Sequence, residues 1–277
     1  TSVLGVIPYF HLDIEDEDSL TERFRKKSRS GLAKIAVIRL PRISNFTDIA
    51  PLEAVDELDV SYVSNISQFG DPDVVIIPGS KNTISDLLWM RQNGLEGKIL
   101  RHAAKGGIVF GICGGYQMLG QSISDPTGAE QKGTVRGMGL LPVTTVFEQE
   151  KRRTRVSGRF AKVGGALAEM SGVCYEGYEI HMGRTVLSKG TVPLVYMEEE
   201  GEQRQDGAQS DHVYGCYMHG IFDMSETVKT FLAAVLRKKG IDPSKITVRD
   251  RNAYKEEQYD RLASIVRENL NMEAVYK

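Results

Sequence analysis

The stretch GIVFGICGGYQMLG, residues 107–120, decides the fold of this 277-residue chain. Its first six residues form an apolar run typical of a buried β-strand. The chain then turns at Cys113, between Gly111 and Gly115, and enters a short helical sequence. A strand that runs through G-x-C-x-G into a helix has the layout of a nucleophile elbow, with a thiol in place of the usual hydroxyl.

Cys113 is therefore the candidate nucleophile. In such an elbow the nucleophile holds a strained backbone conformation, and a Cβ two positions to either side would collide with the neighbouring strand or helix. The start of the helix also offers backbone N–H groups to a developing oxyanion. The alternative is a buried structural cysteine in a glycine-rich turn, and the strand–elbow–helix context favours the nucleophile.

The surrounding sequence predicts an α/β fold with a mostly parallel sheet flanked by helices. Short buried strands alternate with helical stretches, which is the pattern of a parallel sheet with helices on both faces. We expect strands at 34–40, 59–63, 73–77 and 107–112, and helices at 47–57, 82–93 and 95–105. The second half adds partly antiparallel strands at 141–147, 155–160, 192–197 and 213–218, and two packing helices around 228–236 and 259–270.

Composition narrows the function classes. Thirty-five basic and 37 acidic residues give a formal charge of −2, which gives no support to a nucleic-acid or membrane-surface partner. No apolar run approaches the roughly 18 residues of a membrane span, and no secretory signal is visible. The three cysteines do not resemble a disulfide framework, so we expect a reducing cytoplasm.

A thiol nucleophile needs a base, and His219 is the favoured candidate. It follows the apolar run 213–218, and catalytic side chains in α/β folds gather at the carboxyl ends of strands. His181 has a similar placement and is the alternative. The other three histidines are interpreted as surface or packing residues.

The turn IPGSKN, residues 77–82, joins a buried strand to a helix one strand before the elbow. Its backbone N–H groups at Gly79 and Ser80 can complete an oxyanion hole with Gly114. No G-x-x-x-x-G-K-[ST] motif occurs in the chain, so we do not expect this segment to bind ATP.

Cys113 in its elbow, the upstream Pro78-Gly-Ser and the downstream His219 together resemble the class I (triad-type) glutamine amidotransferases. Within that superfamily the sequence is similar to the cobyric acid synthase family. The similarity covers nearly the whole chain, in blocks at residues 7–9 with 16–20, 39–48, 78–83, 111–120, 178–185 and 217–222.

This resemblance implies a mechanism. Cys113 would attack the side-chain amide of glutamine and form a γ-glutamyl thioester, and His219 would act first as base and then as acid. Ammonia would pass to a separate synthetase site, where ATP and Mg²⁺ serve the amidation of a corrinoid, adenosylcobyrinic acid a,c-diamide. No cofactor or metal is expected in this chain. The implied oxyanion and substrate-binding residues are Gly79, Ser80, Gly114, Gln117 and His181.

Two departures from the superfamily pattern matter. The third triad member is normally a glutamate two residues after the histidine, and here that position is Ile221. We therefore expect a Cys–His dyad with slow turnover, with Glu179 as the first acidic residue to consider as a partner of His219. The second departure concerns domains: residues 1–30 resemble the last part and linker of a dethiobiotin-synthetase-like ATP-binding domain, and 31–277 the amidotransferase domain.

Other functions stay open at this point. The chain can be a glutaminase for another acceptor, as in cobyrinic acid a,c-diamide synthase or in the amidation of cell-wall lipid II. The former normally carries an acidic residue before the cysteine, where this chain has Ile112. A non-catalytic docking module is a third hypothesis, and a cysteine peptidase or amidase a weaker fourth.

Overall fold

The computed structural model describes residues 3–10, 31–199, 202–246 and 251–276. By their contacts, the described residues at the two ends, 3–10 and 251–276, form one compact unit, and residues 31–246 form the other. The sequence-based boundary counted the last helix within a domain spanning 31–277, whereas here it contacts residues 3–10. The block 16–20 and most of the expected linker lie outside the described residues.

The larger unit is built on a parallel sheet. Among the described residues its six strands run in the order β13 (Ala208–Ser210), β14 (Val213–Cys216), β6 (Ile108–Ile112), β4 (Val74–Ile77), β1 (Ala33–Ile38) and β3 (Leu58–Val63). All neighbours pair in parallel except β13, which is antiparallel to β14 at one edge. The expected fold class is confirmed.

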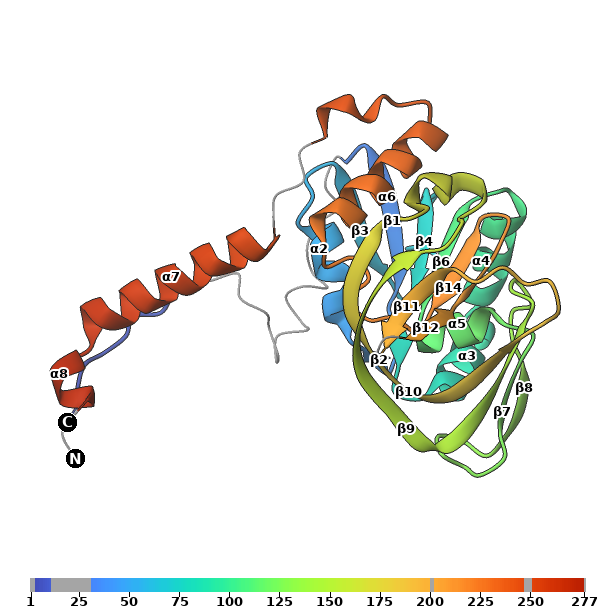
Figure 1. The fold of residues 1–277 in the computed structure, drawn as a ribbon, viewed down its shortest axis with the longest axis horizontal. Coiled ribbons are helices and arrows are strands. Elements are labelled where there is room, and N and C mark those ends of the chain that lie inside the picture. Colours follow the sequence, from blue (N-terminus) through green and yellow to red (C-terminus); the bar gives the residue numbers. More distant parts are fainter. Residues whose placement is uncertain (1–2, 11–30, 200–201, 247–250, 277) are drawn as a thin grey trace. The chain divides into compact units, whose positions relative to one another are not determined.

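Helices cover both faces of this sheet (Figure 1). On one side lie α2 (Ala50–Glu53) and α6 (Ser225–Lys238), and on the other α3 (Thr83–Gln92), α4 (Leu95–Ala104) and α5 (Gly114–Leu119). This double cover explains why β4 and β6 are apolar throughout: every residue of both strands is buried. Helix α6 buries its predicted face, which includes Phe231 and Leu232.

A second, mostly antiparallel sheet follows in the chain. Its strands run in the order β12 (Glu202–Asp206), β11 (Val195–Glu199), β9 (Val143–Phe160), β7 (Ser122–Asp125) and β8 (Gly133–Arg136), and β10 (Cys174–Leu187) pairs with β9. The sequence predicted two strands where β9 is a single strand of 18 residues. The expected strands 141–147 and 155–160 left the charged residues 148–153 outside both, but Arg152 and Arg153 pair with β10, and the register shifts between them and Phe147. The pattern also predicted no strand over β10.

Short elements complete the unit and connect to the site. The bounds are β2 (Ile43–Ser44), η1 (Phe46–Ile49), β5 (Gly79–Ser80), η2 (Gly165–Met170) and η3 (Pro243–Lys245). In the terminal unit, α7 spans Arg251–Asn269 and α8 spans Met272–Val275. Among the described residues, no helix is both long and apolar enough to cross a membrane.

Because β14, β6, β4 and β1 are parallel, their carboxyl ends meet at one edge of the sheet. The residues that follow β6, β14 and β4 are Cys113, the segment leading to His219, and the turn at Gly79. Ligand sites of open α/β sheets lie at this edge. The topology therefore brings together the three segments that the sequence singled out.

Candidate active site

Cys113 occupies the predicted elbow between β6 and α5. Its backbone has φ 52° and ψ −108°, in the left-handed half of φ space that a side chain rarely adopts. A Cβ at Gly115 would lie 1.9 Å from the carbonyl oxygen of Ile77, and one at Gly111 would lie 2.7 Å from the backbone nitrogen of Tyr116. The strained cysteine between two obligatory glycines is the geometry of a nucleophile elbow.

His219 is held rigidly beside this elbow. Its side chain is fully buried, and its backbone exchanges two hydrogen bonds with Tyr178: N–H to the Tyr178 carbonyl at 2.9 Å, and the Tyr178 N–H to its own carbonyl at 3.1 Å. The ring of Tyr178 stacks on the imidazole with centroids 5.2 Å apart. The strand β10 therefore fixes one face of His219 and its place in the chain.

Asp48 orients the imidazole, and this is a residue that the sequence reasoning missed. Its Oδ2 accepts a hydrogen bond from Nδ1 of His219 at 2.7 Å, while Oδ1 accepts the backbone N–H of Gly220 at 2.9 Å. The carboxylate is 2% exposed. The expected Cys–His dyad is therefore wrong, because an acidic side chain occupies the position that orients the histidine. This side chain comes from a different segment of the chain than the glutamate of the superfamily.

The segment that carries Asp48 is itself anchored to the site. It follows β1, and its short strand β2 pairs with β5, with Ile43 opposite Ser80. The chain then reverses at Asn45, whose φ of 49° is in the left-handed region that asparagine tolerates. The signal that could have found Asp48 was its place in the block 39–48, in the loop after the first central strand.

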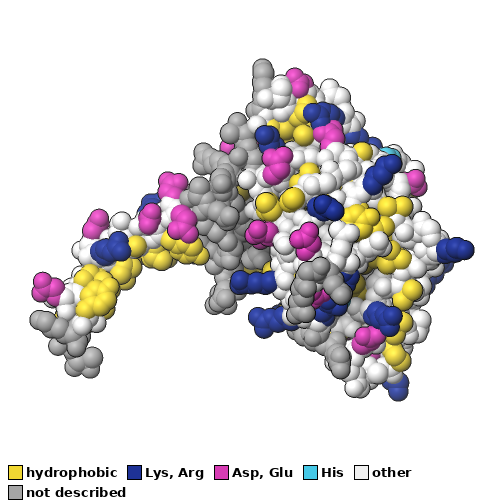
Figure 2. Space-filling view, in the orientation of Figure 1, with side chains coloured by type: hydrophobic (Ala, Val, Ile, Leu, Met, Phe, Trp, Pro, Cys, Tyr) yellow, Lys and Arg dark blue, Asp and Glu magenta, His cyan; other side chains and the backbone are white. Residues whose placement is uncertain are grey.

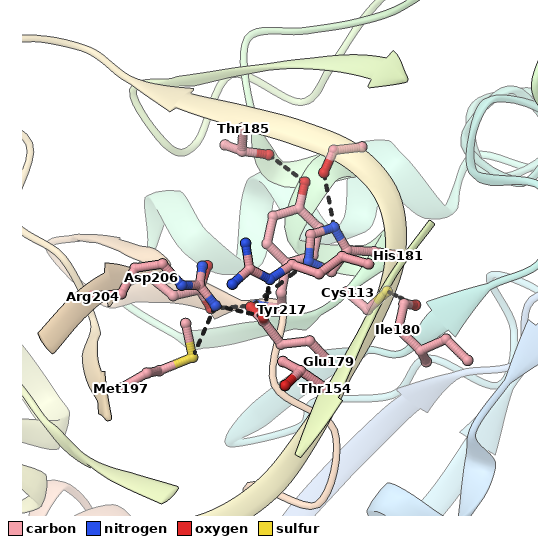
Figure 3. A network of polar contacts seen from close by, with 12 residues as sticks. Cys113, Thr154, Glu179, Ile180, His181, Thr185, Met197, Arg204, Asp206 and Tyr217 are labelled. Carbon is pink, nitrogen blue, oxygen red and sulfur yellow. Dashed lines mark hydrogen bonds and ion pairs between the residues drawn. The ribbon is translucent and has the colours of Figure 1, made fainter. Parts of the chain in front are cut away.

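Glu179, the acidic residue first considered as a partner of His219, lies elsewhere. It accepts from Arg152 at 3.0 Å and from Arg204 at 2.5 Å, and its Oε1 lies 3.7 Å from Nε2 of His181. Burial alone would raise the pKa of Glu179, but these three partners outweigh it and hold the pKa below its usual value. Figure 3 shows this network. Glu179 connects β10 to Arg152 of β9 and Arg204 of β12, and it does not orient His219.

The environment of His219 favours its charged form. Burial lowers the pKa, but the hydrogen bond to Asp48 and the interaction with the side chain of Cys113 outweigh burial and raise it to about 10. At neutral pH the imidazole is therefore protonated and places a positive charge beside Cys113. A second polar side chain, the amide of Asn45, lies 2.8 Å from Nε2.

The predicted oxyanion segments meet at the elbow. A Cβ at Gly114 would lie 2.9 Å from the backbone nitrogen of Ser80, and a Cβ at Gly79 would lie 3.2 Å from Cε1 of His219. The hydroxyl of Ser80 donates to Asp86 at 2.7 Å, and the backbone N–H of Arg42 donates to the same carboxylate at 3.1 Å. The buried Asp86 therefore ties the Gly79–Ser80 turn to Arg42, in the segment that leads to Asp48.

Gln117 lies one helical turn beyond Cys113 and is buried. Its Nε2 donates to the hydroxyl of Tyr217 at 3.0 Å, and its Oε1 accepts from Thr83 at 3.2 Å. The amide is thus held in a fixed orientation behind the nucleophile. A role in binding glutamine stays a prediction for this residue.

His181 lies on the β10 side of the elbow, apart from His219. Its ring stacks on Tyr217 with centroids 3.7 Å apart, and its Nδ1 lies 2.8 Å from the carbonyl oxygen of Gly183. The preceding residue, Ile180, presents its carbonyl oxygen 3.8 Å from Sγ of Cys113 (Figure 3). Of the two histidine candidates for the base, the structure brings His219 and not His181 to the carboxylate of Asp48.

A cavity of about 450 Å³ adjoins this network. Its lining includes Tyr217, Thr185 and His181, and also Arg152, Arg184 and Arg204. Within the part of the chain that the structure describes, no cluster of three or more histidine, cysteine, aspartate or glutamate side chains could hold a metal ion.

A parallel α/β sheet with a cysteine elbow, and a histidine after the adjacent strand, defines the class I glutamine amidotransferase fold. Residues 34–227 match the CobB/CobQ-like glutamine amidotransferase domain. The chain belongs to this family.

Curated relatives extend the match over almost the whole chain. Cobyric acid synthase of Ruminiclostridium cellulolyticum is 53% identical over 279 residues, covering 99% of this chain and 54% of the relative. Cobyric acid synthase of Lachnoclostridium phytofermentans is 44% identical, covering 99% of this chain and 55% of the relative. The chain thus spans about half the length of the curated relatives that it matches.

Solved structures support the fold. PurLQS from Thermotoga maritima aligns with a TM-score of 0.56 at 17% identity, covering 75% of this chain and 99% of that chain. A structure described as a glutamine amidotransferase aligns with a TM-score of 0.52 at 16% identity, covering 75% and 99%. At these identities the likeness concerns the fold alone.

Proposed function

We propose that this chain is the glutamine-hydrolysing part of a cobyric acid synthase. It releases ammonia from glutamine, and the longer protein uses that ammonia to amidate carboxylates of adenosylcobyrinic acid a,c-diamide in cobalamin biosynthesis. The observation that carries the hydrolysis is the Asp48–His219 contact beside the strained Cys113. The support for the acceptor is the 53% identity to a relative named cobyric acid synthase.

In the first step His219 holds the proton of the Cys113 thiol, and the sulfur of Cys113 attacks the side-chain amide carbon of glutamine. The carbon–sulfur bond forms, and the carbonyl electrons move to oxygen, giving a tetrahedral oxyanion. The backbone N–H groups of Gly114 and of the Gly79–Ser80 turn stabilise that charge. This assignment rests on the turn packing directly against the elbow.

The intermediate then collapses to a γ-glutamyl thioester. The carbon–nitrogen bond breaks, and the protonated His219 gives its proton to the departing nitrogen, which leaves as ammonia. His219, now neutral, takes a proton from a water molecule as that water attacks the thioester. Glutamate leaves, Cys113 is regenerated, and the sum is glutamine plus water giving glutamate plus ammonia.

Asp48 acts through His219 and is a positioning residue. With Oδ2 on Nδ1, it directs Nε2 toward the reacting atoms and stabilises the imidazolium form. With Oδ1 on the Gly220 N–H, it also fixes the backbone that follows the histidine. This is the role that the superfamily assigns to a glutamate at the position of Ile221.

The acceptor chemistry lies outside this chain in the proposal. Activation of a carboxylate for amidation requires ATP with Mg²⁺, which the synthetase part of the longer protein would bind. The family resemblance of residues 1–30 to the end of an ATP-binding domain supports the same arrangement. We place no ATP, metal or corrinoid site on the described residues.

The test uses the longer protein with the change Cys113→Ala. Amidation of the corrinoid with glutamine as nitrogen donor should fall to background, while amidation with ammonium salts should proceed at the wild-type rate. Loss of both activities would assign Cys113 a structural role. If a cell-wall precursor, and not a corrinoid, stimulated ATP hydrolysis, the proposed glutamine hydrolysis would stand, but the corrinoid would be rejected as the acceptor.

A further inference from the structure

The described residues at the two ends of the chain, 3–10 and 251–276, form a terminal unit with exposed apolar side chains along one side. We propose that this surface is the docking site of the synthetase half of the longer protein. In this arrangement both ends of the chain complete the same synthetase domain, and the amidotransferase unit, residues 31–246, lies between them in sequence. The proposal goes beyond glutamine hydrolysis and does not depend on it.

The terminal unit is held together by backbone contacts. Gly5 and Leu270 form an antiparallel bridge, and the N–H of Asn271 donates to the carbonyl of Leu4 at 2.8 Å. The approach is close enough that a Cβ at Gly5 would lie 2.0 Å from the carbonyl oxygen of Asn269. The extended residues 3–10 are therefore fitted specifically to the end of α7.

Apolar side chains of this unit are turned outward. Val3, Val6 and Tyr9 are 82%, 77% and 89% exposed, and Tyr276 is 83% exposed. Other large apolar residues of the unit with exposed side chains are Leu4, Ile7, Tyr259 and Val275. Figure 2 shows hydrophobic side chains gathered along one side of the segment that contains α7. Contiguous apolar surface of this kind marks an interaction site.

The unit is also too small to be stable by itself. One extended segment of eight residues and one helix of 19 residues cannot enclose a hydrophobic core. An isolated helix of this length is marginally stable in water, and its stability in proteins comes from packing. The specific fit of residues 3–10 to α7 therefore requires further structure on the exposed apolar side.

The relatives indicate what that structure is. They match 99% of this chain, so both ends of the chain align within them, yet the chain covers only 54–55% of their length. The other part of the same polypeptide is covalently linked to the terminal unit, which gives it a high effective concentration there. We therefore assign it as the occupant, in preference to a second copy of the chain or to residues 31–246.

Hydrogen exchange resolved by peptide tests this assignment. Amides of residues 3–10 and 251–276 should exchange at least about tenfold more slowly in the longer protein than in the 277-residue chain. Peptides from 108–119, in the amidotransferase core, should be the same in both. Equal exchange of the end residues in the two proteins would overturn the proposal. So would slow exchange of these residues already in the isolated 277-residue chain, whether it is a dimer or a monomer whose ends pack on residues 31–246.

Variants of the longer protein provide the second arm. Val6→Asp should restore fast exchange at 251–276 and lower ammonia-dependent amidation, since it places a charge in the proposed contact. The matched control is Ile66→Asp, the same kind of change at a half-exposed apolar residue of the other unit. Equal exchange of 251–276 in both variants would contradict the proposal. Glutamine hydrolysis at Cys113 should be unchanged in Val6→Asp, so this test and that of the proposed function fail independently.

Discussion

The carboxylate of Asp48 lies 2.7 Å from Nδ1 of His219, although 171 residues separate the two in the sequence. The same carboxylate holds the N–H of Gly220, so both of its oxygens are committed to the strand end that carries the histidine. A buried carboxylate with two such partners resists rotation. The histidine consequently has an orienting group that compensates for Ile221 at the position of the superfamily glutamate.

Replacing Asp48 with asparagine should slow glutamine hydrolysis strongly. An amide in this position can donate to Nδ1, which selects the wrong tautomer and does not stabilise the imidazolium. In triads of this kind such a change lowers kcat by about 10²- to 10⁴-fold. Steady-state glutaminase assays on the purified, folded variant would measure the effect.

The control for that experiment is Glu179→Gln. Glu179 pairs with Arg152 and Arg204 and does not contact His219 in the structure. Its replacement should lower the unfolding temperature because Arg152 and Arg204, which are 40% and 31% exposed, lose a buried carboxylate and keep only Glu199 as a charge partner. We expect kcat of the folded protein to change by less than about threefold. A larger loss of kcat than in Asp48→Asn would reverse the roles assigned to the two acids.

The raised pKa of His219 predicts how stability depends on pH. In the unfolded chain the imidazole has its ordinary pKa of about 6.5, and in the folded protein the pKa is about 10. The stabilisation from the Asp48–His219 pair is therefore complete below about pH 6.5 and is lost as the pH rises toward 10.

Urea unfolding of wild type and Asp48→Asn across pH 6–10 measures this dependence. The difference in unfolding free energy between the two proteins should be about 3 kcal/mol at the acid end, as for other broken buried pairs, and should shrink with rising pH. A difference that stays constant over this range would show that His219 does not change its charge there.

Two glycine-to-alanine changes, one in the elbow and one in α4, should have opposite effects on the free energy of unfolding. Gly115→Ala places a Cβ 1.9 Å from the carbonyl oxygen of Ile77, so the strand and helix must separate, and we expect a loss of about 3 kcal/mol or more. Gly97→Ala, within α4, meets its nearest atom at 3.9 Å and should stabilise the protein by about 0.5–1 kcal/mol. Thermal unfolding of the two variants checks both signs, and a neutral Gly115→Ala would contradict the elbow geometry.

Variants of Gln117 distinguish a contact with the substrate from a packing role for this residue. If its amide contacts glutamine, as the family resemblance implies, Gln117→Leu should raise KM by about tenfold with a smaller change in kcat. Thr83→Val removes the hydrogen bond to Oε1 and a long one to Glu130, and it should have the weaker effect. A fall in kcat with KM unchanged in Gln117→Leu would assign the residue to positioning Tyr217 alone.

Much of the fold could be predicted because its signals are local. The buried strands β1, β4 and β6 are apolar runs between helical patterns, and the elbow is a contiguous motif, so both were found within a residue or two. The long β9–β10 ladder was missed because the charged residues 148–153 indicated a turn. In the structure Arg152 and Arg153 pair with β10 across a register shift from Phe147, and no local pattern reports that pairing.

The orienting acid was missed for a related reason. The superfamily rule looks two residues beyond the histidine, where this chain has Ile221, and Asp48 reaches His219 only after the sheet has formed. The same is true of Glu179, which lies near His181 in sequence but pairs with arginines from β9 and β12. Both relationships depend on the order of strands, and not on spacing along the chain.

The most direct measurement of the central claim is covalent labelling of the 277-residue protein by a diazo-ketone analogue of glutamine, followed by peptide mass spectrometry. We predict one added analogue per chain, located on Cys113, with protection by glutamine and slower labelling in Asp48→Asn. Cys216 and Cys174, the other cysteines of the chain, should stay unmodified. An unlabelled Cys113 in the folded protein, or a label on another residue, would contradict the account.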